Sequence, residues 1–175
     1  SVRRAISSED IFGLLRSIND VARAVSAFDN LELVVKMHPG DAHNLGLYQE
    51  QIEAGMNAEI VVKGNLPKML ADSDIVIIHD SSVCLEGLLL GKDVICYNYS
   101  GLPSYITGLK DSINGDPNLE PALMFASNVE ELKSAMKGVF EAPGDRNTDV
   151  DLVEVLYNSD SNYNVKEVVE NLIAS

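Results

Sequence analysis

Helical and strand-like apolar patterns alternate along this chain, and the alternation restricts its fold more than any other feature. Apolar runs suited to buried strands occupy residues 31–37, 59–62, 74–78 and 94–97, with a fifth at 123–126. Patterns of helical spacing separate the first four. Strands that alternate with helices are typical of a parallel sheet covered on both faces. We therefore predict an α/β fold, a Rossmann-like parallel sheet of about five strands with helices on both faces.

The helices are predicted from apolar periodicity and from their end signals. They span residues 11–25, 43–54 (ending at Gly55), 65–71 and 82–90, and two short ones span 150–157 and 165–173. The capping-box pattern Ser127-Asn128-Val129-Glu130 predicts another, with Val129, Leu132, Met136 and Phe140 on one side. The Gly- and Pro-rich segment 100–121 has no clear period. A loop of that length either covers a ligand or is a surface loop.

Charge and cysteine content exclude several classes of partner. The net charge of -14 and the sequence pI near 4.4 predict repulsion of nucleic acids and of anionic membranes. Cys84 and Cys96 lie in apolar settings, so we predict that both are buried free thiols. They form no CxxC pair or Cys/His cluster, and we predict no metal site and no cofactor. No apolar run approaches the roughly 20 residues of a membrane-spanning helix. A cytoplasmic location fits these features.

The first candidate site follows the strand predicted at 31–37. Its residues are Lys36-Met37-His38-Pro39, and ligands of open α/β sheets bind beyond the carboxyl ends of strands. Pro39 should hold His38 extended. The His38 ring could then donate to a phosphate oxygen or protonate a leaving group. Lys36 either supplies a cation for an anionic ligand or faces solvent.

The second candidate site follows the strand predicted at 74–78. It consists of His79-Asp80-Ser81-Ser82 and, one helical turn later, Glu86. The serines precede a helix, whose first N–H groups favour an anion such as phosphate, or else one of them only caps that helix. Glu86 lies among leucines, so it needs a partner such as a ribose hydroxyl or an exposed position. His79 and Asp80 either orient the neighbouring loops or contact the ligand.

Common nucleotide and hydrolase motifs are absent from the sequence. It contains no GxGxxG fingerprint, no P-loop lysine motif and no GxSxG nucleophile elbow. These absences argue against a dehydrogenase, a P-loop NTPase and an α/β-hydrolase.

Taken together, the two motifs resemble the C-terminal half of GT-B glycosyltransferase-like enzymes. The resemblance rests on Lys36-Met37-His38-Pro39, on residues 70–77 and on Asp80-Ser81-Ser82 with its continuation to residue 95. It is strongest towards CDP-glycerol glycerophosphotransferases of teichoic acid synthesis and capsule Kdo- and sialyl-transferases with HP and SS motifs. Asp93 stands where these relatives usually have Pro, a departure that affects packing more than chemistry.

The resemblance implies that residues 1–175 form a single Rossmann-like domain, the donor-binding half of a longer two-domain enzyme. A missing N-terminal domain would hold the acceptor and the catalytic base, so no catalytic residue is assigned here. The implied partner is a CDP-, CMP- or UDP-linked donor, from which a glycosyl or glycerophosphoryl group is transferred in surface polysaccharide synthesis. Such enzymes act in the cytoplasm, at the inner face of the membrane where other parts of the protein attach them. The implied substrate-binding residues are Lys36, His38, Pro39, Asp80, Ser81, Ser82 and Glu86.

Two other functions stay open at this point, and with them the question of whether the chain is part of an enzyme. The first is a UDP-N-acetylglucosamine 2-epimerase-like enzyme, which shares the fold more distantly. The second is a non-catalytic, flavodoxin-like interaction or regulatory module, which predicts no nucleotide binding.

Overall fold

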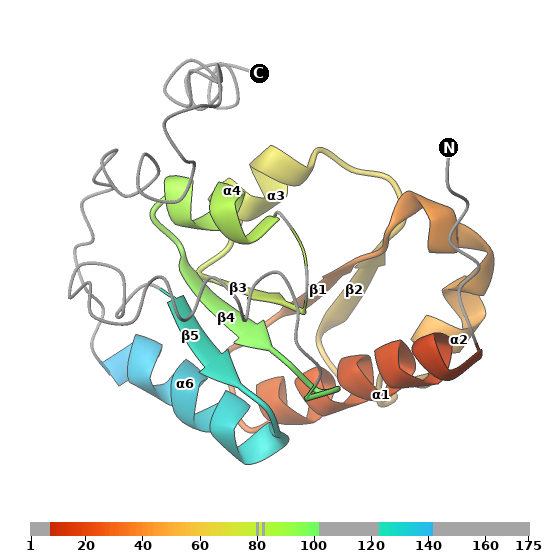
Figure 1. The fold of residues 1–175 in the computed structure, drawn as a ribbon, viewed down its shortest axis with the longest axis horizontal. Coiled ribbons are helices and arrows are strands. Elements are labelled where there is room, and N and C mark those ends of the chain that lie inside the picture. The colour runs from red at the N-terminus through yellow and green to blue at the C-terminus, as the bar shows by residue number, and fades with distance from the viewer. Residues whose placement is uncertain (1–7, 80, 82, 102–122, 142–175) are drawn as a thin grey trace.

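The computed structural model describes residues 8–79, 81, 83–101 and 123–141, which form parallel strands and helices (Figure 1). All but the first two residues of the predicted segment 100–121, and the predicted helices 150–157 and 165–173, lie outside the described residues. The elements are α1 (Ser8–Val25), β1 (Leu33–Lys36), the 3-10 helix η1 (Pro39–Asn44), α2 (Leu45–Glu50), β2 (Ala58–Val61), α3 (Leu66–Asp72), β3 (Ile75–Ile78), α4 (Val83–Leu89), β4 (Asp93–Tyr97), β5 (Leu123–Ala126) and α6 (Val129–Glu141).

All five predicted strands are present and their pairings are parallel, but they form two sheets instead of one. β1 pairs with β2, while β3, β4 and β5 form a three-stranded sheet in that order. In register, Val34 lies beside Glu59, and Ile77 lies beside Ile95. The prediction of a single sheet of about five strands is therefore wrong in this respect. Apolar runs specify where strands form, but not which neighbouring backbones exchange hydrogen bonds.

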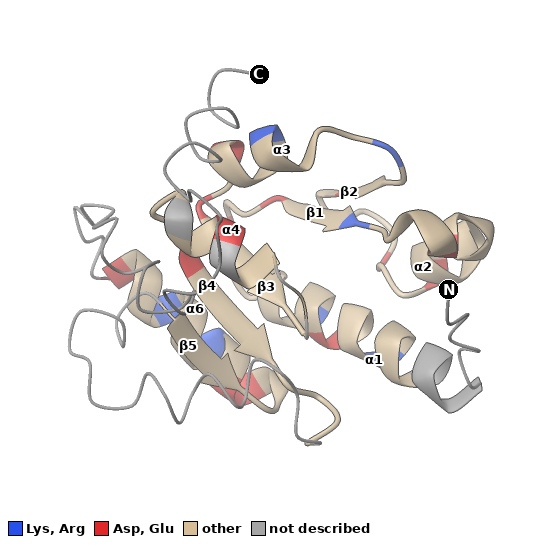
Figure 2. Ribbon diagram, turned by 45° about the horizontal axis from the view of Figure 1, so that its top comes forward, with Lys and Arg blue, Asp and Glu red and all other residues tan. Residues whose placement is uncertain are grey.

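Side-chain packing joins the two sheets where backbone hydrogen bonds do not. One core cluster contains Leu33 of β1 and Ile95 of β4, and it is extended by Val35 of β1 and by Ile75 and Ile77 of β3. The β1–β2 pair lies on the β3 side of the larger sheet in both ribbon views (Figures 1 and 2). The two sheets thus share one apolar core.

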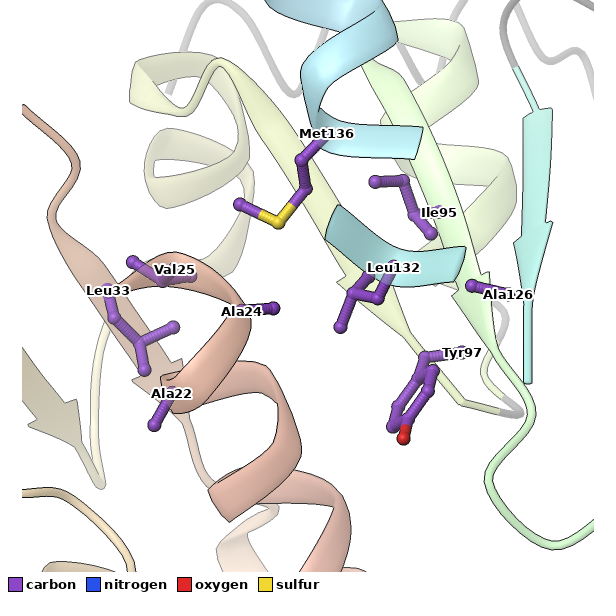
Figure 3. Close-up of a cluster of buried hydrophobic side chains, with 9 residues drawn as sticks. All are labelled: Ala22, Ala24, Val25, Leu33, Ile95, Tyr97, Ala126, Leu132 and Met136. Atoms are coloured by element: carbon purple, nitrogen blue, oxygen red, sulfur yellow. The ribbon is translucent and has the colours of Figure 1, made fainter. Parts of the chain in front are cut away.

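Strand β4 shows that helices cover both faces of the larger sheet, as predicted. Its alternate residues Val94 and Cys96 pack in the cluster of α3 and α4. Ile95 and Tyr97 belong to the opposite cluster, with α1 and α6. Figure 3 shows Leu132 of α6 in that second cluster, together with side chains from α1 and β4. A strand buried on both faces is typical of parallel sheets.

Several predicted helix boundaries are wrong by one or more residues. The helix predicted over 43–54 is a 3-10 helix, η1, followed by α2, which ends at Glu50, five residues before Gly55. The cap of α6 is displaced by one residue, because Asn128 Oδ1 accepts from the Glu131 N–H at 3.0 Å. The Glu131 carboxylate in turn accepts from the Ser127 N–H at 2.8 Å. Helix ends depend on such side-chain bonds, which periodicity does not reveal.

Candidate functional site

The carboxyl ends of β1, β3 and β4 converge on the N-terminal half of α1. Met37, which follows β1, is 1% exposed and packs in a cluster with Leu15 of α1. Tyr99, which follows β4, lies so close to Gly13 of α1 that a Cβ there would be 2.9 Å from Tyr99 Cε2. The ring of His79, which follows β3, lies 4.3 Å from the Tyr99 ring, centroid to centroid. Both predicted motifs therefore lie at the same edge of the fold.

His38 is exposed and extended, as the following Pro39 predicts, with φ of -65° and ψ of 138°. Its Nδ1 accepts a hydrogen bond from the Gly40 N–H at 3.1 Å, so the side chain caps η1, in which Pro39 is the first residue. The loop is also held from α2, where the Tyr48 hydroxyl donates to Asp41 Oδ2 at 3.5 Å. Burial is the main cause that raises the pKa of Tyr48 to about 12, so this donor keeps its proton at neutral pH.

Lys36 has a structural role at the end of β1. Its Nζ donates to the carbonyl oxygens of Met37 at 2.7 Å and Val62 at 3.2 Å. The ammonium therefore ties the ends of β1 and β2 together. Figure 2 shows basic colouring at the end of β1, the strand whose last residue is Lys36. The sequence analysis offered two roles for Lys36, binding an anionic ligand or facing solvent, and neither includes these bonds to carbonyl oxygens. The cation remains at the site edge, where an anionic ligand could still use its third N–H.

Ser81 begins α4 as a capping residue. Its Oγ accepts from the Val83 N–H at 3.3 Å, and its carbonyl oxygen accepts from the Cys84 N–H at 3.1 Å. Capping, which the sequence left open beside ligand binding, is thus established for Ser81, and the two roles are compatible. Asp80 and Ser82 lie outside the described residues. Among the described residues, no hydrogen bond joins Ser81 to the His38 loop.

Glu86 is a half-buried carboxylate in the first turn of α4. Within the described part of the chain, no hydrogen bond or ion pair reaches its side chain. Burial raises the pKa of Glu86 above its usual value, because desolvation disfavours the charged form. A half-buried carboxylate without a protein partner can accept a hydrogen bond from another group, such as a ligand hydroxyl.

We expect Glu86→Gln to stabilise the ligand-free protein slightly at neutral pH. Because folding raises the pKa of Glu86, the folded state binds more protons, and wild-type stability falls as pH rises from the unfolded pKa through the folded one. Glutamine has no charge to desolvate, so the Glu86→Gln variant does not lose this stability as the pH rises. The gain should stay below about 1 kcal/mol because the side chain is largely solvated. Urea unfolding of both proteins at pH 7 and pH 4 checks this, and an equal difference at both pH values would contradict it.

Tyr97 and Asp20 form a buried contact at this edge that the sequence analysis did not single out. The Tyr97 hydroxyl donates to Asp20 Oδ2 at 2.8 Å, across the interface between β4 and α1. Asp20 is 9% exposed and Tyr97 is 3% exposed. Tyr97 could have been noticed in the sequence, because it is followed by Asn98 and Tyr99 and these polar side chains stand together at the end of a predicted strand. Its partner in α1 could not be identified from spacing alone.

Both cysteines are buried free thiols, as predicted. Burial raises the pKa of Cys84 to about 12, and Cys96 donates through Sγ to the His79 carbonyl oxygen at 3.2 Å. In the described part of the chain, no group of three or more His, Cys, Asp or Glu side chains is placed to hold a metal ion.

The two thiols should not react with Ellman's reagent at pH 8 while the protein is folded. Each is 0% exposed, and the thiolate, which is the reacting form, is disfavoured by burial. In guanidinium chloride both should react within minutes. Fast reaction of either thiol in native buffer would contradict the packing described for α4 and β4.

Comparison with known proteins gives one family. The model of the capsule polysaccharide biosynthesis protein family matches residues 12–128, about two thirds of the chain. The chain belongs to this family. The match runs from within α1 to the end of β5 and therefore includes both motifs and the strands that end at them. Family membership supports a role in surface polysaccharide synthesis.

The two other comparisons, with curated proteins and with solved structures, give no match. Among the described helices, none is both long enough and apolar enough to cross a bilayer.

Proposed function

We propose that this chain is the donor-binding domain of a GT-B-like transferase that moves a glycosyl or glycerophosphoryl group in capsule or related polysaccharide synthesis. The observation that supports it best is the convergence of the ends of β1, β3 and β4 on α1, which brings both motifs to one edge. Ligands of open α/β sheets bind at this edge. Family membership supports the polysaccharide pathway.

In this proposal, the HP loop and the start of α4 bind the phosphates of a CDP-, CMP- or UDP-linked donor. His38 accepts from the Gly40 N–H through Nδ1, so in the neutral ring its Nε2 holds the proton and donates. Pro39 fixes the loop, Lys36 adds positive charge at the strand end, and Asp80, Ser81 and Ser82 complete the turn into α4. Donors aimed at the leaving phosphate would stabilise the charge that develops there.

Glu86 would bind the ribose in the same proposal. Its half-buried carboxylate has no partner in the described part of the chain, and a ribose hydroxyl would supply the missing donor. The acceptor and the catalytic base would come from an N-terminal domain, and the reaction would take place on the cytoplasmic side of the membrane.

Calorimetric titration with CMP, CDP, UDP and ADP tests this function. We expect saturable binding that favours one base, and a loss of about tenfold or more in His38→Ala, which removes a hydrogen bond to a charged group. His43→Ala is the matched control, because His43 is an exposed histidine in η1 without a motif role. Failure of every nucleotide to bind at millimolar concentration would contradict the proposal and favour the non-catalytic interaction module. Binding of cytidine nucleotides without binding of UDP would exclude the epimerase-like alternative, whose substrate is UDP-linked.

A further inference from the structure

Two histidines at the site edge use Nδ1 in opposite ways, one as a hydrogen-bond acceptor and the other as a donor. His38 Nδ1 lies 3.1 Å from the Gly40 amide nitrogen, and His79 Nδ1 lies 3.0 Å from the Tyr97 carbonyl oxygen. An amide N–H can only donate and a carbonyl can only accept, so each bond determines where the ring proton lies. In the neutral rings, His38 has its proton on Nε2 and His79 has its proton on Nδ1.

The His79 ring is held in place from several sides. Tyr99 packs against it at a centroid distance of 4.3 Å and an interplanar angle of 36°. Tyr99 is itself in close contact with α1 at Gly13, where a Cβ would lie 2.9 Å from its ring. Cys96 Sγ donates to the His79 carbonyl oxygen. The ring orientation, and with it the direction of Nε2, is therefore set by packing as well as by the Tyr97 bond.

The remaining ring nitrogen of His79 is an unused acceptor. In the part of the chain that the structure describes, no hydrogen bond reaches Nε2 of this half-buried side chain. With the proton on Nδ1, Nε2 offers a lone pair. A lone pair repels a phosphate oxygen but accepts a hydrogen bond from a hydroxyl group. His79 and His38 therefore favour different groups of a ligand.

We propose that His79 binds a hydroxyl group of the ligand through Nε2, while His38 donates to an oxyanion. This inference rests on the proposed function, because it concerns the same edge, and it adds His79 as a binding residue. It also requires a ligand that has both a hydroxyl group and an oxyanion. Two sources of the hydroxyl fit, the ribose of the nucleotide and the transferred sugar or glycerol.

The alternative is a purely structural role, in which His79 only links the end of β3 to the end of β4 through its hydrogen bond to Tyr97. Two substitutions separate the two roles. His79→Asn keeps an N–H close to the position of Nδ1, and hence the bond to Tyr97, but has no atom at Nε2. His79→Gln places its amide near Nε2 and gives up the bond to Tyr97. A purely structural role predicts that His79→Gln lowers the melting temperature while neither variant changes affinity.

The binding test uses the full 175-residue chain with CMP, UDP, their 2′-deoxy forms, UDP-glucose and CDP-glycerol. We expect His79→Asn to keep the wild-type melting temperature and to weaken binding about three- to tenfold, the loss of one neutral hydrogen bond. If the hydroxyl is the 2′-hydroxyl of ribose, the 2′-deoxy nucleotide should bind the variant and the wild type equally, and if it is the 3′-hydroxyl, the 2′-deoxy nucleotide should lose as much affinity as the parent nucleotide. If it belongs to the transferred group, only UDP-glucose or CDP-glycerol should lose affinity.

Three results would overturn the inference. Wild-type affinity of His79→Asn for every ligand would overturn it alone and leave the proposed function standing. No binding of any ligand to the wild type would overturn the proposed function and this inference together. Long-range ¹⁵N–¹H NMR spectra of the three histidine rings give an independent test, since His79 should show the Nδ1–H tautomer and His38 the Nε2–H tautomer. The opposite tautomer at His79 would also overturn the inference.

Discussion

Leu132→Ala is expected to lower the free energy of unfolding by about 2 to 5 kcal/mol, the usual cost of a cavity in a tight core. Leu132 is 0% exposed and lies in the cluster where α1, α6, β1 and β4 meet. Figure 3 shows it among side chains from these elements. Because this cluster also extends to β3, the cavity should loosen the connection between the two sheets.

Leu47→Ala is the matched control for this loss. Leu47 lies in α2 and is 40% exposed, so the same chemical change removes little buried surface, and its cost should be below about 1 kcal/mol. Urea unfolding of both variants measures the difference. Similar losses in the two variants would contradict the placement of α6 on the sheet.

Tyr97→Phe is expected to destabilise the protein by about 1 to 3 kcal/mol, because it leaves a buried carboxylate without its donor. The bond at risk joins the Tyr97 hydroxyl to Asp20 Oδ2 at 2.8 Å. Burial, followed by the bond to Asp20, raises the pKa of Tyr97 well above its usual range, so the phenol donates throughout the neutral range. The substitution should also weaken nucleotide binding, since this bond ties α1 to the edge where the motifs lie.

Asp20→Asn provides the comparison. Asparagine keeps an oxygen that accepts from Tyr97 and removes the charge, so Tyr97→Phe should cost more in the wild-type background than in Asp20→Asn. Chemical unfolding of the two single variants and the double variant gives the coupling energy. A coupling energy of zero would show that the charge of Asp20 adds nothing to this contact, and would contradict the expectation.

Local patterns were sufficient to predict most elements of the fold, but not how the strands pair. The apolar runs at 74–78 and 94–97 identified β3 and β4, because buried parallel strands need continuous apolar sequence. How the β1–β2 pair lies against β3–β4–β5 depends on contacts between residues distant in sequence, such as Leu33 with the cluster around Ile95. No local period encodes such contacts.

Only the local features of the candidate site could be predicted from the sequence. The extended His38 and the capping Ser81 follow from rules that act over two or three residues, and the structure confirms both conformations. The bonds of Lys36 to two carbonyl oxygens and of Tyr97 to Asp20 were not predictable, since each needs a partner from another element. The ligand-binding roles of Lys36, His38, Pro39, Asp80, Ser81, Ser82 and Glu86 stay predictions.

Backbone amide NMR of the ¹⁵N-labelled chain, titrated with CMP, CDP, UDP and ADP, tests the central claim most directly. We predict saturable shifts for one base, concentrated at residues 37–40 and at Ser81 and Glu86, and lost in Ser81→Ala. Residues at the opposite ends of the strands, such as Leu33 and Asp93, should not shift. Absence of saturable shifts with every nucleotide, or shifts centred on Leu33 and Asp93, would contradict donor binding at this edge.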